Sequence, residues 1–263
     1  HTGTWTAKAM DHAKRFGRVH RAFDGSNGSF RSLPSESEII PSGQARYLWY
    51  CSNNTIEGTQ YPTPPAALSP LMVDASSDIF SRPLELAHHA AVFASAQKNL
   101  GPAGVALAVI HRDCLEGVDA ELPDMLSCRA HARAGSRLNT PPTFGIYMIG
   151  LVLKWIRQAG GLSGMAERNA RKAALLYGIL DQHASFYRVH PDPSCRSSMN
   201  VVFRTPSEAL DQRLVAESEQ HGMNGLAGHR SVGGLRASIY NAFPEAGCQA
   251  LAQLLDDFAR SHG

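Results

Sequence analysis

A lysine and an aspartate each stand at the end of a short apolar run in the first half of the chain. Lys98 follows the run 91–93 and precedes a Gly-Pro-Ala-Gly turn, and Asp74 ends the run 71–73. Side chains at the carboxyl ends of strands in α/β proteins face the crevice where ligands bind. An amine there can bond to an aldehyde cofactor, and a carboxylate can keep the pyridine nitrogen of pyridoxal phosphate protonated. The pair predicts a pyridoxal phosphate site.

Both residues also have ordinary structural interpretations. A lysine at a strand end can extend its stem along the protein and place its ammonium in water. Free lysine has a pKa of about 10.4, so a nucleophilic role requires burial or a cationic neighbour. An aspartate after a strand can cap the following helix. From these segments alone the alternatives stay open.

Apolar spacing predicts the elements that hold these residues. Helical periodicity occurs at 5–16 and 143–159, whereas 24–44 has the composition of a surface loop. Four short apolar runs bounded by turn residues predict strands buried on both faces, at 47–50, 71–73, 91–93 and 105–110. Strands alternating with helices predict an α/β fold through residue 160.

The pattern changes after a Gly-Gly pair at 160–161. Helices are predicted at 162–181, 207–221 and 244–261, with strands at 199–204 and 235–240. This order is typical of a compact α+β unit. We therefore predict a large cofactor-binding domain of residues 1–160 and a smaller C-terminal domain of residues 161–263.

Composition excludes several classes of protein. The 263 residues are 43% hydrophobic and 18% charged with a net charge of +2, which predicts a globular protein without a general field for nucleic acid or anionic membranes. The apolar run 144–153 is far shorter than the roughly 20 residues that cross a bilayer. The first residues lack a secretory signal, so a cytoplasmic location is expected. The five cysteines are widely spaced, which predicts reduced thiols and no metal site.

Four runs resemble the phosphoserine aminotransferases, which are fold-type I pyridoxal phosphate enzymes of the class V group. The runs are SAQKNLGPAG, LNTPPTFGIYMIGLVLKWI, GHRSVGGLRASIYNA and the ending DDFARSHG. The resemblance covers essentially the whole chain in order. It implies a large domain with a mainly parallel mixed sheet and a small α+β domain. It also implies transamination between glutamate and 3-phosphohydroxypyruvate in serine biosynthesis. Bacterial members often also accept the phosphohydroxythreonine precursor of vitamin B6, and the sequence does not decide this point.

The resemblance assigns cofactor roles to five residues. Lys98 matches the lysine that bonds to pyridoxal phosphate, and Asp74 matches the partner of its pyridine nitrogen. Trp5 matches an indole that stacks on the ring, and Thr55 a hydroxyl that binds the phenolic oxygen. Gln97 matches a phosphate ligand. Without the resemblance, Trp5 would be assigned to the apolar face of a helix and Thr55 to a turn.

Further residues of the resemblance bind phosphate and substrate. Asn139 and Thr140 match residues that reach the partner subunit's cofactor, which implies a homodimer with shared sites. Arg236 matches the clamp on the substrate α-carboxylate, a task that suits the bidentate guanidinium. His229 and Arg230 match a pair that binds the substrate phosphate or distal carboxylate. Spacing alone equally allows loop capping and solvated basic side chains.

Two alternatives to an active phosphoserine aminotransferase stay open, and the first concerns the residues that the resemblance places ahead of His1. The family has an N-terminal portion there, with a Gly-rich phosphate loop and a His-Arg pair for the substrate. A chain without these parts could be a catalytically impaired or inactive fragment of the fold. Another class V enzyme, such as an alanine–glyoxylate aminotransferase or a cysteine desulfurase, is the second alternative. A desulfurase needs a nucleophilic cysteine on a mobile loop, for which Cys128 is the least implausible candidate.

Overall fold

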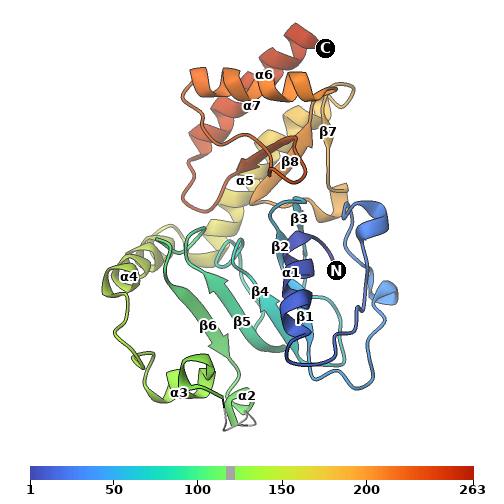
Figure 1. The fold of residues 1–263 in the computed structure, drawn as a ribbon. Helices are drawn as coiled ribbons and strands as arrows, with labels where there is room; N and C mark the ends of the chain where they lie inside the picture. Colours follow the sequence, from blue (N-terminus) through green and yellow to red (C-terminus); the bar gives the residue numbers. More distant parts are fainter. Residues whose placement is uncertain (117–121) are drawn as a thin grey trace.

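The structure, a computed structural model, describes residues 1–116 and 122–263. Two lobes are visible, one around a four-stranded sheet and one around a three-stranded sheet (Figure 1). Helix α5 (Gly161–Gln182) runs between them. Each lobe has its own hydrophobic cluster, one centred on side chains such as Val73 and Leu100 and the other on side chains such as Leu176 and Phe203.

The first sheet has the order β1-β4-β5-β6. Its strands are β1 (Leu48–Cys51), β4 (Leu71–Asp74), β5 (His89–Ser95) and β6 (Ala106–Ile110). The first three are mutually parallel and β6 is antiparallel to β5. The prediction of an α/β fold with a mainly parallel mixed sheet is confirmed. Cys51, Asp74 and Phe93 are aligned across β1, β4 and β5, so the carboxyl ends of these strands meet at one edge.

The prediction that all four runs are buried on both faces is wrong for β6 and for the start of the first run, where Tyr47 is 46% exposed. No residue of Ala106–Ile110 is buried, and Val109 is 43% exposed. The reason lies in strand order, because β6 is an outer strand that pairs with β5 alone among the described residues. An apolar run does not by itself reveal whether a strand lies at the centre or the edge of a sheet.

The second lobe packs three helices on the sheet β7-β8-β9. Its strands are β7 (Arg188–Val189), β8 (Asn200–Arg204) and β9 (Leu235–Ser238), all antiparallel. Helices α5, α6 (Glu208–Gln220) and α7 (Glu245–His262) match the predicted helices to within one residue at each end. Strand β9 ends two residues earlier than predicted, at Ser238 rather than 240.

Shorter elements connect the two sheets and cover the first one. Helix α1 (Thr4–Ala13) ends before the predicted residue 16, and α4 (Thr143–Gln158) agrees with its prediction. The loop 24–44 contains only short 3-10 turns. The remaining elements are β2 (Asn53–Asn54), β3 (Thr59–Gln60), α2 (Asp113–Glu116), α3 (Cys128–Arg133) and 3-10 turns at Asp124–Leu126 and Pro193–Cys195. Within the described ranges, no helix combines the length and apolarity that a membrane crossing demands.

Candidate active site

Lys98 lies in the turn after β5, and its amine meets a buried hydroxyl. Lys98 Nζ donates a hydrogen bond to Thr55 Oγ1 at 3.0 Å, and Thr55 is only 6% exposed. The turn is closed because the backbone N–H groups of Leu100 and Gly101 both donate to the Ala96 carbonyl. The fully buried side chain of Leu100 anchors the turn in the core. The structure therefore brings together Lys98 and Thr55, both of which are predicted cofactor residues.

Asp74 lies on the same edge of the sheet as the lysine turn. It is the last residue of β4, and its Oδ1 accepts a hydrogen bond from the Ser76 N–H at 2.9 Å. Ser76 Oγ in turn accepts from the Ser95 N–H at 3.0 Å, which ties the loop after β4 to the end of β5. The carboxylate is thus held at the strand end by short-range contacts, with part of its surface open to solvent.

The charges of Asp74 and Lys98 both act on the thiol of Cys51. Burial raises the pKa of Cys51 well above its ordinary value, the carboxylates of Asp74 and Asp78 raise it further, and the Lys98 ammonium opposes them. The thiol donates to the Asn53 carbonyl at 3.3 Å and stays protonated at neutral pH. Cys51 is therefore a structural part of this edge, because a nucleophile would have to be a thiolate.

Trp5 is placed beside the Thr55 loop by the start of α1. The backbone N–H and the hydroxyl of Thr4 both donate to Glu57 Oε1, at 2.7 and 2.8 Å. Glu57 is buried in the same loop as Thr55. The Trp5 indole is 38% exposed, so it is not a core residue of the helix, and Lys8 Nζ lies 4.7 Å from its ring centroid. The ring is therefore available for stacking.

The predicted phosphate ligands are exposed. Gln97 lies next to Lys98 with its side chain in solvent, while Asn139 and Thr140 lie exposed in the loop before α4. The structure thus places Gln97 beside the lysine but does not bring Asn139 and Thr140 into the cluster around it. Their role in a neighbouring subunit's site stays a prediction.

The predicted substrate residues lie on the second lobe. Arg236 is a half-buried residue of β9, and its Nε is a buried atom without a hydrogen-bond partner among the described residues. His229 Nδ1 lies 2.7 Å from Ser231 Oγ, and Arg230 is exposed. Gly233 has φ +66°, a left-handed conformation that suits glycine in the tight turn leading to β9. These basic side chains are open to an anion.

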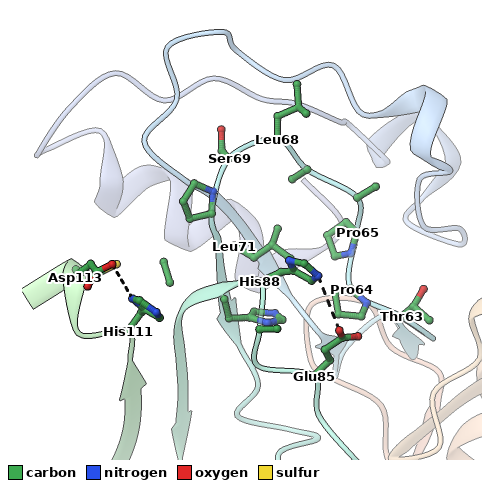
Figure 2. A pocket seen from close by; sticks show the side chains of 17 residues that line it. Thr63, Pro64, Pro65, Leu68, Ser69, Leu71, Glu85, His88, His111 and Asp113 are labelled. Atoms are coloured by element: carbon green, nitrogen blue, oxygen red, sulfur yellow. Dashed lines mark ion pairs between the residues drawn. The ribbon is translucent and has the colours of Figure 1, made fainter.

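A surface cavity of about 700 Å³ lies at the opposite end of the first sheet (Figure 2). Its walls include the amino ends of β4 and β5, whereas Lys98 and Asp74 follow the carboxyl ends. Figure 2 shows His88 paired with Glu85 and His111 paired with Asp113. The nitrogen–oxygen distances are 3.9 Å and 3.6 Å, respectively. Over the ranges that the structure covers, no three His, Cys, Asp or Glu residues are arranged to hold a metal ion. The cavity is separate from the candidate active site.

Sequence reasoning missed several residues that build the site. Glu57 holds the helix of Trp5, Ser76 holds Asp74, and Asn99 carries hydrogen bonds immediately after Lys98. Only Asn99 had a signal in the sequence, its position next to the lysine. The others are ordinary polar residues of turns until the fold buries them.

Comparison with known proteins agrees with this geometry. The profile of the aminotransferase class-V family matches residues 11–251. Curated phosphoserine aminotransferases of Herpetosiphon aurantiacus and Niallia circulans are both 46% identical over 263 residues, which is 100% of this chain and 73% of each relative. The solved phosphoserine aminotransferase of Bacillus circulans subsp. alkalophilus has a TM-score of 0.97 at 46% identity, over 100% of this chain and 73% of that one.

The pyridoxal phosphate-bound phosphoserine aminotransferase of Trichomonas vaginalis has a TM-score of 0.89 at 34% identity, over 97% of this chain and 73% of that one. The chain belongs to the class V aminotransferases and, within them, to the phosphoserine aminotransferase family. Its fold is that of the fold-type I pyridoxal phosphate enzymes, as predicted, and it is an aminotransferase.

The residues present fit pyridoxal phosphate as the cofactor. An amine and a hydroxyl lie 3.0 Å apart at one edge of the sheet, a carboxylate lies at the same edge, and an indole with an exposed ring lies beside the hydroxyl's loop. The amine can bond to the aldehyde of the cofactor and the hydroxyl can bind its phenolic oxygen. The carboxylate can bind the pyridine nitrogen, and the indole can stack on the aromatic ring.

Proposed function

We propose that the protein transfers the amino group of glutamate to 3-phosphohydroxypyruvate, giving 2-oxoglutarate and O-phosphoserine in serine biosynthesis. The hydrogen bond between Lys98 and Thr55, on the edge shared with Asp74, carries this proposal. The identity of 46% with phosphoserine aminotransferases over the entire chain supports the substrate pair. Phosphohydroxythreonine, which has a similar phosphate and a similar amino acid end, is a second substrate to test.

Four residues serve the cofactor in this proposal. Pyridoxal phosphate, when bound, draws electrons away from the substrate Cα. Lys98 would hold the cofactor through its amine and would move the proton at the substrate Cα, first as base and then as acid. Thr55 orients the lysine amine by accepting its hydrogen bond. Asp74 accepts a hydrogen bond from the protonated pyridine nitrogen, and Trp5 covers one face of the ring.

The remaining site residues bind anionic groups. Arg236 grips the substrate α-carboxylate with its guanidinium, and His229 and Arg230 engage the phosphate or distal carboxylate. Gln97 binds the cofactor phosphate together with Asn139 and Thr140 of the partner subunit.

A second copy of the chain is the partner that this arrangement requires. Helix α4, which follows the Asn139–Thr140 loop, exposes Phe144, Tyr147 and Leu151 by 71%, 62% and 43%. Such an apolar surface is typical of a protein interface. We also propose a cytoplasmic location, and a division into a cofactor domain (1–160) and a small domain (161–263), which the separate hydrophobic clusters support.

The proposal is tested by loading the purified protein with pyridoxal phosphate. Visible absorbance, with borohydride trapping of the cofactor on the peptide that contains Lys98, is expected for the wild type and for Lys14→Ala. It should disappear in Lys98→Ala. Lys14 is a suitable control because it is exposed and, among the residues that the structure describes, forms an ion pair with Asp11 alone.

Substrates are then added one at a time to the loaded protein. Glutamate and O-phosphoserine should change the visible absorbance of the loaded protein, whereas alanine and cysteine should leave it unchanged. Conversion by alanine or cysteine alone would favour another class V enzyme. Failure to bind the cofactor would favour an inactive fragment of this fold.

A further inference from the structure

Three buried asparagines lie where the two lobes meet. Asn99 directly follows Lys98, Asn241 lies just beyond β9 with its Arg236, and Asn169 belongs to α5. Their exposed fractions are 5%, 0% and 1%. Buried amides are costly unless they are hydrogen-bonded, so their partners reveal what they hold in place.

A hydrogen bond joins the lysine turn of the first lobe to the segment after β9 in the second lobe. The backbone N–H of Asn241 donates to Asn99 Oδ1 at 3.0 Å. Asn99 Nδ2 donates to the Ile79 carbonyl at 3.1 Å, and Asn241 Nδ2 to the Phe80 carbonyl at 3.0 Å. Both amides therefore hold the segment that follows Asp74, and the same bonds connect the lysine turn with the segment after β9.

Helix α5 contributes the third member of the asparagine joint, which consists of Asn99, Asn169 and Asn241. Asn169 Nδ2 donates to Asn241 Oδ1 at 2.8 Å and to the Ser81 carbonyl at 3.0 Å. Lys172, fully buried and one turn further along α5, donates to the carbonyls of Ile239 and Tyr240 at 2.9 and 2.8 Å. The segment between Arg236 and Asn241 is thereby fixed on the helix.

We propose that Asn99 is a positioning residue, whose bond to Asn241 sets the place of the Lys98 amine relative to the Arg236 guanidinium. The inference rests on the proposed function, in which Lys98 moves the proton at the substrate Cα and Arg236 binds the carboxylate attached to the same Cα. Because both targets belong to one carbon atom, the distance between the Lys98 amine and the Arg236 guanidinium can vary little. A misplacement of about 1 Å can cost on the order of 100-fold in rate.

Two substitutions of Asn99 separate positioning from stability. Asn99→Ala removes the acceptor for Asn241, and kcat/KM for glutamate should fall at least about ten-fold. Glutarate has no amino group and needs only the anion-binding residues. Its affinity should therefore change less than about two-fold, because its binding does not depend on the position of Lys98. Asn99→Asp keeps the oxygen acceptor, so kcat/KM should stay close to the wild type even though a buried carboxyl lowers thermal stability.

The matched control is a buried polar residue within the second lobe. Asp211 is 5% exposed and accepts from the Thr205 N–H and hydroxyl, both at 2.8 Å. Asp211→Ala should lower the melting temperature and leave KM and kcat for glutamate unchanged. If the three variants lose activity in the order of their melting temperatures, Asn99 has a structural role only and the proposal is overturned.

Hydrogen exchange gives a readout independent of activity. In Asn99→Ala, backbone amides at 96–100 and at 239–241 should both exchange faster, whereas Asp211→Ala should affect neither segment. Faster exchange at 96–100 alone would overturn the proposal. A wild-type protein that binds the cofactor but does not respond to glutamate would refute the proposed function, and the exchange measurement would still decide whether this bond couples the two segments.

Discussion

The two halves of the candidate site differ in whether their polar groups already have hydrogen-bond partners within the chain. The Lys98 amine already has a partner in Thr55, and the Asp74 carboxylate accepts from the backbone of its own turn. On the other lobe, Arg236 Nε lacks a partner among the described residues, and Arg230 is exposed. In the proposed function, the half that would handle covalent chemistry is arranged in advance, and the half that would bind anions leaves its donors for the ligand.

Arg236→Lys tests the half of the candidate site that lies on the second lobe. The ammonium keeps the charge but loses the paired donors, so kcat/KM for glutamate should fall roughly 100-fold, within the 2–5 kcal/mol typical of a truncated charged pair. Thermal stability should hardly change, because no internal hydrogen bond of Nε is lost. Steady-state kinetics and thermal denaturation measure both effects. Arg260→Lys, an exposed change on α7, is the control, and an unchanged KM for glutamate in Arg236→Lys would refute the clamp.

Thr55→Val tests the half that is arranged in advance. Valine keeps the shape but removes the acceptor of the Lys98 amine, so the free energy of unfolding should fall by about 1 kcal/mol. The glutamate half-reaction should slow roughly ten-fold, because the amine loses its orientation. Urea denaturation and stopped-flow absorbance measure these quantities. Thr143→Val, at an exposed hydroxyl on the first residue of α4, should alter neither quantity, and equal effects in both variants would contradict the assignment.

The third test concerns the contacts between the two lobes and depends on pH. Burial lowers the pKa of Lys172 from 10.5 to about 8. Between these values the unfolded chain binds a proton that the folded chain does not, so Lys172 contributes more stability as pH rises from 8 to 10.5 and less as pH falls through 8. The melting temperature of the wild type, relative to that of Lys172→Met, should therefore increase between pH 7 and pH 10. A constant or decreasing difference would contradict the burial of this ammonium.

Elements with long or strongly patterned sequences were predictable from the chain alone. Helices α4, α5 and α7 follow from apolar spacing, and β4 from an apolar run between turn residues. The two-residue strands β2, β3 and β7 could not be predicted, because their pairing is decided by tertiary contacts rather than by local pattern. The exposure of β6 was missed because strand order decides which strand is outermost.

The site was predictable where one residue is unusual in its local context. The position of Lys98 after a buried strand indicated a site there, and the resemblance supplied Thr55 as a ligand of the cofactor's phenolic oxygen. The structure places the Thr55 hydroxyl within hydrogen-bond distance of the Lys98 amine. The contact of Asn99 with Asn241 spans 142 positions and pairs a side chain with a backbone group. A single sequence contains no signal for such a pair. The roles of Asn139, Thr140 and the basic residues near β9 remain predictions.

The asparagine joint has a consequence for how the molecule melts. If one lobe unfolded alone, the carbonyls of Phe80 and Ser81 and the backbone N–H of Asn241 would lose hydrogen-bond partners that lie in the other lobe. Phe80 also holds a left-handed φ of +56°, a conformation unfavourable for a residue with a side chain, and its turn depends on those same amides. Calorimetry should accordingly record one endotherm with equal calorimetric and van't Hoff enthalpies, since neither half is self-sufficient.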